Sequence, residues 1–427
     1  MMDALLHDTA ERALAAMRRA GFDAAQAAAS EIRSDEVNFA HDEPSLLRST
    51  HTCKVALAGL VDGRKASTEI ATFDADALAA RVAALHADAL AAPRDDANAV
   101  SSGERATIVQ GPQEGDVAVL ADAVRDLLDF RARETPRMRL DEGHASHTLL
   151  RSRMLTSAGS ELACSVGWYA MSAFGTAREG AKSSSFNIAA GTTHDLAARR
   201  AHEHFGLGAM LRDTERQIDT RGIDGKFVGE VVLTPPAVAD LLGWLHGQLG
   251  DVQLIAGSSL YRERVGTRIA SPLLTLESRF DAPGVVAITP DACVARPVEL
   301  LGAGVLTALT PSLYGSRKTG LAHVPVAGGW ALAAGDTALA DVIAGVRRGA
   351  LVGRLSMGVP AANGDFSAIV KNSFAIDGGA VGAALSEVMI AGNMARMLED
   401  VSAVSRERLD TGPLLLPWLR VGGLHFS

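Results

Sequence analysis

The sequence predicts an α+β fold in two halves: an N-terminal α/β half with antiparallel strands and long helices, and a C-terminal β-dominated domain with few helices. Amphipathic helical stretches with clear stop signals recur up to about residue 215, whereas short apolar runs rich in Gly and Val predominate after Gly222. The chain has 427 residues, more than one small core requires. We therefore expect an N-terminal region at 1–215 and a C-terminal domain at 226–427.

The N-terminal half is expected to contain two subregions, 1–93 and 116–215, joined by a polar linker at 94–115 that is rich in Asp, Asn, Ser and Gly. Apolar residues at helical spacing predict helices, and Gly21 and Pro93 follow two of them as stop signals. An Asp-Gly pair at 62–63, between two β-leaning runs, predicts a hairpin. The expected helices span 3–20, 74–92, 116–134 and 193–212, and an antiparallel meander is expected over 146–190.

In the C-terminal half, a strand is expected at 227–233, directly before a helix that runs to about Gln248. Thr234 is the expected N-cap of this helix, and the two prolines after it suit its first turn. A second helix is expected at 337–348. The remaining stretches have the pattern of short strands joined by turns.

Composition narrows the possible functions. The net charge is −9 and the basic residues are scattered, so no nucleic-acid partner is expected. No apolar stretch approaches the length of a membrane span and the N-terminus lacks a signal-peptide pattern, so no membrane association is expected. The three cysteines, Cys53, Cys164 and Cys293, are too sparse for a disulfide framework and favour a cytoplasmic location.

The residues alone indicate no catalytic site. The Rossmann fingerprint, the phosphate-binding loop and the Gly-x-Ser-x-Gly elbow are all absent from the sequence. His202 and His204 would point in different directions on a helix, and His144 and His147 would lie on opposite faces of a strand, so neither pair predicts a metal site. Cys293 has no activating partner in the sequence and is expected to be structural.

Three segments of the C-terminal half, at 363–367, 374–379 and 386–394, resemble the TldD/PmbA family. The stretches 306–320 and 417–424 fit the same family, and the N-terminal helix and hairpin fit it more loosely, so the resemblance covers nearly the whole chain. The signature turns contain Gly364, Asp365, Phe366, Ser367, Gly392 and Asn393. We interpret them as tight turns that need Gly and capping side chains, with direct substrate contact as the alternative.

The family has two kinds of member. In the TldD-like kind, a helix carries His-Glu-x-x-x-His and a later Cys completes a zinc site, with the Glu as general base. The paired TldE-like kind, also called PmbA, lacks this motif. Here Gly243 stands for the first His, Trp244 for the Glu and Gln248 for the second His. The resemblance therefore implies a TldE-like subunit with no catalytic residues and no cofactor of its own.

The resemblance implies the non-catalytic subunit of a heterodimeric zinc metallopeptidase that acts on unfolded or modified peptides. A TldD-like partner would carry the zinc, and an extended peptide could lie along a sheet edge of this chain. The alternative is a divergent, metal-free homologue recruited as a homodimeric enzyme or a peptide-binding scaffold in a biosynthetic pathway. His246, Asp291 and Cys293 would then be the first catalytic candidates. A third interpretation is a purely structural or chaperone-like peptide binder.

The loop at 289–292 and the side chain of Trp244 each lead to one further expectation. The family has an acidic Asp-Asp-Glu-Gly element where this chain has about Thr289-Pro290-Asp291-Ala292, so one acid remains, the Gly is lost and the role of the loop stays open. Trp244 is expected to be largely buried, with its indole N–H donating to an acceptor.

Overall fold

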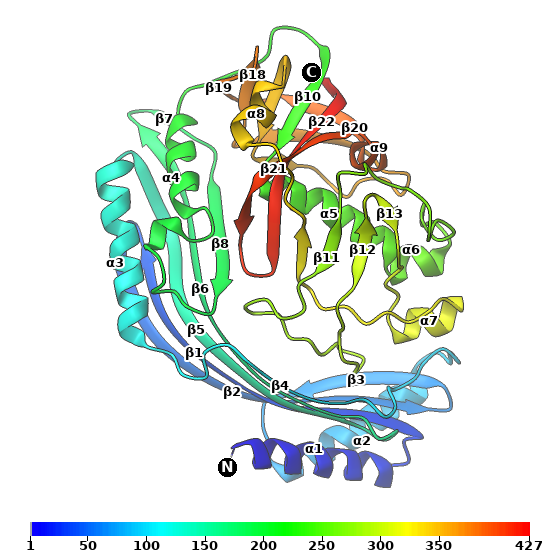
Figure 1. Cartoon of the computed structure of the whole chain (residues 1–427). Coiled ribbons are helices and arrows are strands. Elements are labelled where there is room, and N and C mark those ends of the chain that lie inside the picture. The colour runs from blue at the N-terminus through cyan, green and yellow to red at the C-terminus, as the bar shows by residue number, and fades with distance from the viewer. Residues whose placement is uncertain (1) are drawn as a thin grey trace.

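The structure, a computed structural model that describes residues 2–427, is organised around two β-sheets. The first is a long curved sheet in the N-terminal half, and the second half of the chain lies on its concave side (Figure 1). The chain passes from one sheet to the other between Arg216, where α4 ends, and Thr220, where the first strand of the second sheet begins. This is the α+β architecture that the sequence predicts.

The first sheet has the strand order β3-β2-β1-β5-β6-β4, and β7 and β8 also pair with β6. All of its neighbours are antiparallel except β4, which pairs parallel to β6. The predicted hairpin is confirmed, because Asp62 and Gly63 take the positive φ values of 47° and 70° that a tight turn needs. The strands are β1 (Ala24–Ala40), β2 (Glu43–Val61), β3 (Arg64–Ile70), β4 (Arg105–Gln110), β5 (Met138–Thr156), β6 (Glu161–Glu179), β7 (Lys182–Ser183) and β8 (Asn187–Thr193).

Helices cover the two ends of this sheet. Helices α1 and α2 bury their apolar faces against β1 and β2, where Ala25, Ala27 and Ala29 of β1 are small enough for α1 to pack closely. Helices α3 and α4 enclose a separate core at the other end. The helices are α1 (Met2–Arg19), α2 (Ala75–Ala91), α3 (Val117–Glu134) and α4 (Leu207–Arg216).

Two expectations for this half are corrected. The helix expected at 193–212 is wrong over its first part, since only α4 and one short turn, η1 (Ala201–Glu203), are helical. Asp195 accepts from the main-chain N–H of Ala197 and Asp126 from that of Ala201, so side chains bind N–H groups that a helix would use. The expected linker at 94–115 contains β4, whose pairing with β6 is a long-range contact.

The second sheet combines many short strands. Its main path is β13-β12-β11-β14-β22-β10-β15-β18-β19-β9. Strands β20 and β21 pair with β22, β17 pairs with β20, and β16 pairs with β17. The strands are β9 (Thr220–Arg221), β10 (Phe227–Leu233), β11 (Leu276–Ser278), β12 (Glu299–Gly302), β13 (Val305–Leu306), β14 (Trp330–Leu332), β15 (Arg348–Val352), β16 (Arg354–Ser356), β17 (Asp365–Lys371), β18 (Phe374–Asp377), β19 (Ala380–Leu385), β20 (Met389–Asn393), β21 (Val401–Asp410) and β22 (Leu414–Phe426).

The helices of this half are short apart from α5, which lies at the centre of the largest core. The helix expected at 337–348 is shorter, because Gly345 ends α8 and the chain from Arg348 pairs as β15 with β10 and β18. None of the helices within residues 2–427 is long and apolar enough to cross a membrane. The helices are α5 (Pro235–Leu249), α6 (Asp251–Ala256), α7 (Leu313–Thr319), α8 (Leu339–Ala344) and α9 (Met394–Glu399).

Candidate functional site

The candidate site is built on α5, which follows β10 directly. Thr234 is the N-cap residue, as predicted, but its side chain makes no capping bond to the helix. Its hydroxyl donates instead to the carbonyl oxygen of Gly353 at 3.0 Å, and its N–H donates to that of Val352 at 3.0 Å. The start of α5 is therefore anchored to the end of β15, and Leu241, Leu245 and Leu249 face the core with no exposed surface.

Gly243 and Trp244 face away from the centre of this core. Gly243 is exposed, and a Cβ built on it would meet no atom within 4 Å. Trp244 is only partly buried, with its ring edge-on to Tyr261 at 6.1 Å between centroids. The prediction for its N–H is wrong: Nε1 is enclosed but has no hydrogen-bond acceptor within the described residues. Packing against Tyr261 and Gly364 places the indole without providing an acceptor.

Gln248 is 2% exposed, and its amide joins two loops to α5. The amide nitrogen donates to the carbonyl oxygen of Ala362 at 3.0 Å, and the amide oxygen accepts from the N–H of Leu260 at 2.9 Å. Both ends of the side chain are therefore occupied by main-chain groups. The zinc motif has its second His at this position. In this chain Gln248 stands there, and its side chain binds the main chain of two loops instead of a metal.

The turn that contains Gly364 and Asp365 is fastened to the turn that contains Asn393. Asn393 donates to the carbonyl oxygen of Asn363 at 2.9 Å and to Asp365 at 2.8 Å, while its own amide oxygen caps α9 by accepting from the N–H of Arg396 at 3.1 Å. Hydrogen bonds from Asn393 and then Asn363 lower the pKa of Asp365. These polar groups bind one another, which is the geometry of structural turns.

The other signature residues also have packing roles. Gly364 adopts a φ of 92°, which favours glycine, and a Cβ on Gly392 would lie 2.4 Å from Leu424. Phe366 is 8% exposed and belongs to the main core. Ser367 lies on the exposed side of β17, where its hydroxyl contacts the sulfur of Met389 at 2.9 Å.

His246 points to the opposite side of α5 from Trp244. Its ring packs on Trp330 with 4.3 Å between centroids, and its Nε2 is enclosed with no partner among residues 2–427. Burial alone lowers the pKa of His246 to about 4, so the ring is neutral near pH 7. Among residues 2–427 no carboxylate forms an ion pair with His246 that would raise this pKa and prepare the ring as a general base.

Asp291 and Cys293 lie on a loop that contacts the first sheet. The carbonyl oxygen of Pro290 accepts from the amide of Gln26 at 2.9 Å, and Asp291 accepts from the N–H of Leu313 at the start of α7 at 2.9 Å. Burial, followed by Glu104 and Asp291, raises the pKa of Cys293 to about 11, which keeps it as an inactive thiol. Among the described residues His246 packs on Trp330, whereas Cys293 and Asp291 bond within their own loop and to Leu313, so no contact brings the three alternative candidates into one site.

The same loop contains a residue in an unusual conformation. Ala292, which stands where the family pattern has Gly, is fully buried and adopts a φ of 58°. A Cβ is unfavourable in this left-handed region. The loop therefore has the backbone conformation that favours Gly, although the residue is Ala292. The same loop contacts both halves of the molecule.

These residues do not fit a zinc ion. Gly243 and Trp244 offer no zinc ligand, and the amide of Gln248 is committed to two loops. Within residues 2–427, no group of three or more His, Cys, Asp or Glu side chains is arranged to hold a metal.

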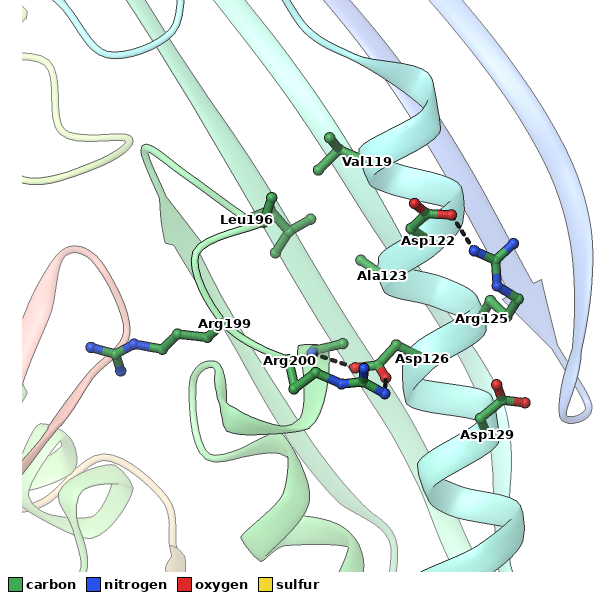
Figure 2. A pocket seen from close by; sticks show the side chains of 11 residues that line it. Val119, Asp122, Ala123, Arg125, Asp126, Asp129, Leu196, Arg199 and Arg200 are labelled. Carbon is green, nitrogen blue, oxygen red and sulfur yellow. Dashed lines mark hydrogen bonds and ion pairs between the residues drawn. The ribbon is translucent and has the colours of Figure 1, made fainter.

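A charged depression of about 350 Å³ lies between α3 and the loop at 196–201, as Figure 2 shows. Asp126 forms an ion pair with Arg200 and accepts from the N–H of Ala201 at 2.7 Å, and Asp122 pairs with Arg125. The two Asp126 contacts fasten the loop to α3, whereas Asp122 and Arg125 both belong to α3. Sequence analysis predicted no functional residue here, and the pairing explains the structure of the loop rather than a reaction.

Sequence comparison defines the class of protein. Residues 225–427 match the family described as the PmbA/TldA metallopeptidase C-terminal domain. Together with the motifs above, this match assigns residues 225–427 to the PmbA/TldD family, which is metallopeptidase-like.

Individual relatives place the chain within this class. It is 28% identical over 197 residues to the metalloprotease PmbA of Escherichia coli O157:H7; the match spans 42% of this chain and 43% of that protein. It is similar in fold to TldE from Thermococcus kodakarensis, with a TM-score of 0.82 at 16% identity over 98% of this chain and 100% of that one. A candidate modulator of DNA gyrase from Bacteroides thetaiotaomicron gives a TM-score of 0.85 at 19% identity over 99% and 98% of the chains. The fold is therefore shared over both halves.

Proposed function

We propose that this chain is the zinc-free, TldE-like subunit of a heterodimeric zinc metallopeptidase of the TldD/TldE type. A TldD-like partner supplies the zinc, and the assembly cleaves unfolded or modified peptides during proteolysis or peptide maturation. This chain completes the substrate cleft. The three cysteines are free thiols, which agrees with a cytoplasmic location.

The observation that supports this proposal most strongly is the structural role of Gln248. A chain that had lost only one ligand would keep the rest of the metal site, whereas here both His positions and the Glu position of the motif are replaced. Gln248 holds two loops through main-chain bonds, so its replacement has become part of the fold. A hydrolytic zinc site needs its ligands and a base, and no residue on this face of α5 supplies them.

The alternative, a metal-free enzyme that uses His246, Asp291 and Cys293, finds less support. Cys293 has a raised pKa, the pKa of His246 is lowered by burial alone, and Asp291 binds the start of α7. Nucleophilic catalysis needs an activated thiolate beside a base. A zinc-free homodimer that turns over a substrate would favour this alternative.

The test is to purify the chain, a TldD-like zinc protein and their mixture, and to measure zinc content and cleavage of an unfolded peptide by each. We expect zinc in the TldD-like protein and in the mixture. We expect cleavage only in the mixture, and a chelator should stop it. Stoichiometric zinc in this chain alone, or chelator-insensitive cleavage by it, would refute the proposal. A pull-down that detects no association would refute the heterodimer.

A further inference from the structure

A cavity of about 530 Å³ lies between the two halves of the molecule, in the size range of ligand pockets. One wall is formed by β8 and α4 from the first half. The other is formed by the start of α5, β15, the turn before β18 and the β21–β22 hairpin. No residue of the predicted site lines it, so its function is separate from the zinc-motif positions.

The lining is mostly apolar. Phe205 and Met210 contribute from one half, and Leu351, Phe374 and Trp418 from the other. Ile188 of β8 also lines the cavity and remains 51% exposed. Burial of such surface is worth about 25 cal/mol per Å², so the cavity favours an apolar occupant.

The open edge of β8 runs along this cavity. On one side β8 pairs with β6, and on the other the N–H of Thr192 donates to the carbonyl oxygen of Thr411 at 3.0 Å. Residues two apart on a strand point their main-chain groups to the same side, so Ala190 directs its N–H and C=O toward the same edge as Thr192. In the part of the chain that the structure describes, no main-chain bond joins Ala190 to the hairpin.

Two contacts bound the open edge. Thr411 closes it at Thr192, and at the other end Asn372 donates to the carbonyl oxygen of Phe186 at 3.2 Å. Asn372 lines the cavity, is 9% exposed, and its amide oxygen has no partner within residues 2–427. An acceptor of this kind would be satisfied by an N–H of a bound molecule. Between these contacts the edge is about 17 Å long at roughly 3.4 Å per residue, enough for a peptide of about five residues. The N–H of Ile188 already donates to the side-chain oxygen of Asn187 at 3.0 Å, so Ala190 is the position where a peptide main chain can pair.

We propose that this cavity binds an extended peptide whose main chain pairs with β8 at Ala190 and whose large apolar side chain enters the space between the halves. The choice of a peptide as ligand rests on the proposed function; the apolar selectivity rests on the lining alone. Asp213, at the rim, is paired with Arg216 at 3.3 Å, so the charges at the rim balance and the selectivity comes from the apolar lining, which cannot solvate a carboxylate. The site therefore selects apolar over acidic residues at one position of the peptide.

The test measures, by calorimetry on the full-length chain alone, the binding of a capped alanine heptapeptide with a central Leu or a central Asp. We expect the Leu peptide to bind about ten-fold or more tightly, because a buried Leu side chain contributes roughly 1.5–3 kcal/mol. Equal affinities, or no binding of the Leu peptide, would overturn the proposal. Binding of acetyl-leucinamide as tight as that of the Leu peptide would also overturn it, since β8 would then contribute nothing.

Two variants separate the parts of the site. Ala209→Trp places a bulky ring at the cavity from the exposed surface of α4, and Ala190→Pro removes the open N–H, a change that an edge strand tolerates. Each should weaken binding of the Leu peptide about ten-fold. Ala80→Trp, on the exposed face of α2, is the matched control and should bind as the unaltered chain does.

Unchanged affinity in both Ala209→Trp and Ala190→Pro, with thermal unfolding showing both folded, would exclude the cavity. This assay needs no zinc partner. Selective peptide binding by this chain, together with a pull-down that finds no TldD-like partner, would leave the inference standing and refute the proposed function. Partner-dependent cleavage with no peptide binding by this chain would do the reverse.

Discussion

The strands of the two sheets are held in place by different kinds of contact. In the first, β1 pairs with β2 and β5 over almost its whole length, and β5 pairs with β6 over a similar span, so each strand is held by a long series of main-chain bonds. In the second, many strands have only two to five residues, and single side chains such as Gln248 and Asn393 tie the loops between them. Removal of one polar side chain should therefore lower the free energy of unfolding more in the second half than in the first.

Loss of core volume should affect both halves alike, and it is the largest expected effect. Leu162 of β6 and Leu241 of α5 have no exposed surface. Replacing either with Ala should lower the free energy of unfolding by about 3 kcal/mol, from lost burial and the cavity that remains. Chemical denaturation followed by tryptophan fluorescence measures both. A loss below about 1 kcal/mol at one of the two sites would show that the half containing it repacks to fill the cavity. It would contradict the expectation that both halves respond alike.

A pH effect on stability is expected from His246 in the second half, beside one from His204 in the first half, whose pKa burial also lowers. The unfolded ring has a pKa near 6.5 and the folded ring one of about 4, so the unfolded chain binds the proton first as pH falls. The stabilisation is fully present above about pH 6.5, is lost progressively toward pH 4, and amounts to about 3 kcal/mol, since one pKa unit corresponds to about 1.4 kcal/mol.

His246→Phe keeps an aromatic ring against Trp330 and removes the titration. The difference between unaltered and variant chains in the slope of unfolding free energy against pH isolates His246 from the other histidines. Identical slopes between pH 6.5 and pH 4 would contradict the burial of this ring.

Gln248→Leu tests the polar ties directly. It leaves the carbonyl oxygen of Ala362 and the N–H of Leu260 without partners, and should cost about 2 kcal/mol. The matched change in the first sheet is Ser34→Ala, which removes a 3.1 Å hydroxyl bond to Thr148 across the β1–β5 ladder. That variant should change stability by less than about 0.5 kcal/mol. Equal losses would mean that both halves depend on such ties to the same degree.

The smallest expected effect is a gain. Ala292→Gly should stabilise the chain by about 0.5–1 kcal/mol, because it relieves the Cβ at a φ of 58° and loses only part of that gain to the flexibility of Gly in the unfolded chain. Ala295→Gly, at a buried position of the same loop without positive φ, should instead destabilise by about 1 kcal/mol. Thermal unfolding measures both, and destabilisation by Ala292→Gly would show that the methyl group contributes more through packing than it costs in strain.

The local sequence was a good guide where one element carries its own signal. Helices α1, α2 and α3 and the hairpin at Asp62 were predicted because apolar spacing, the stop signals Gly21 and Pro93, and an Asp-Gly turn are local features of the sequence. The motif positions on α5 were also readable, since helix start and residue spacing both lie in one stretch. Strand β4 and the loop at 194–206 were missed, because pairing with β6 and hydrogen bonds from Asp126 come from distant residues.

By itself the sequence determined the α+β class, the helical N-terminal segments and the replacement of the zinc motif by Gly243, Trp244 and Gln248, because periodicity and residue identity are local properties. Only the tertiary structure decided that Gln248 holds two loops, that His246 packs on Trp330, and that Cys293 bonds within its own loop. It alone also revealed the cavity beside β8. Such features depend on which distant surfaces meet, and a cavity is the space that their packing leaves.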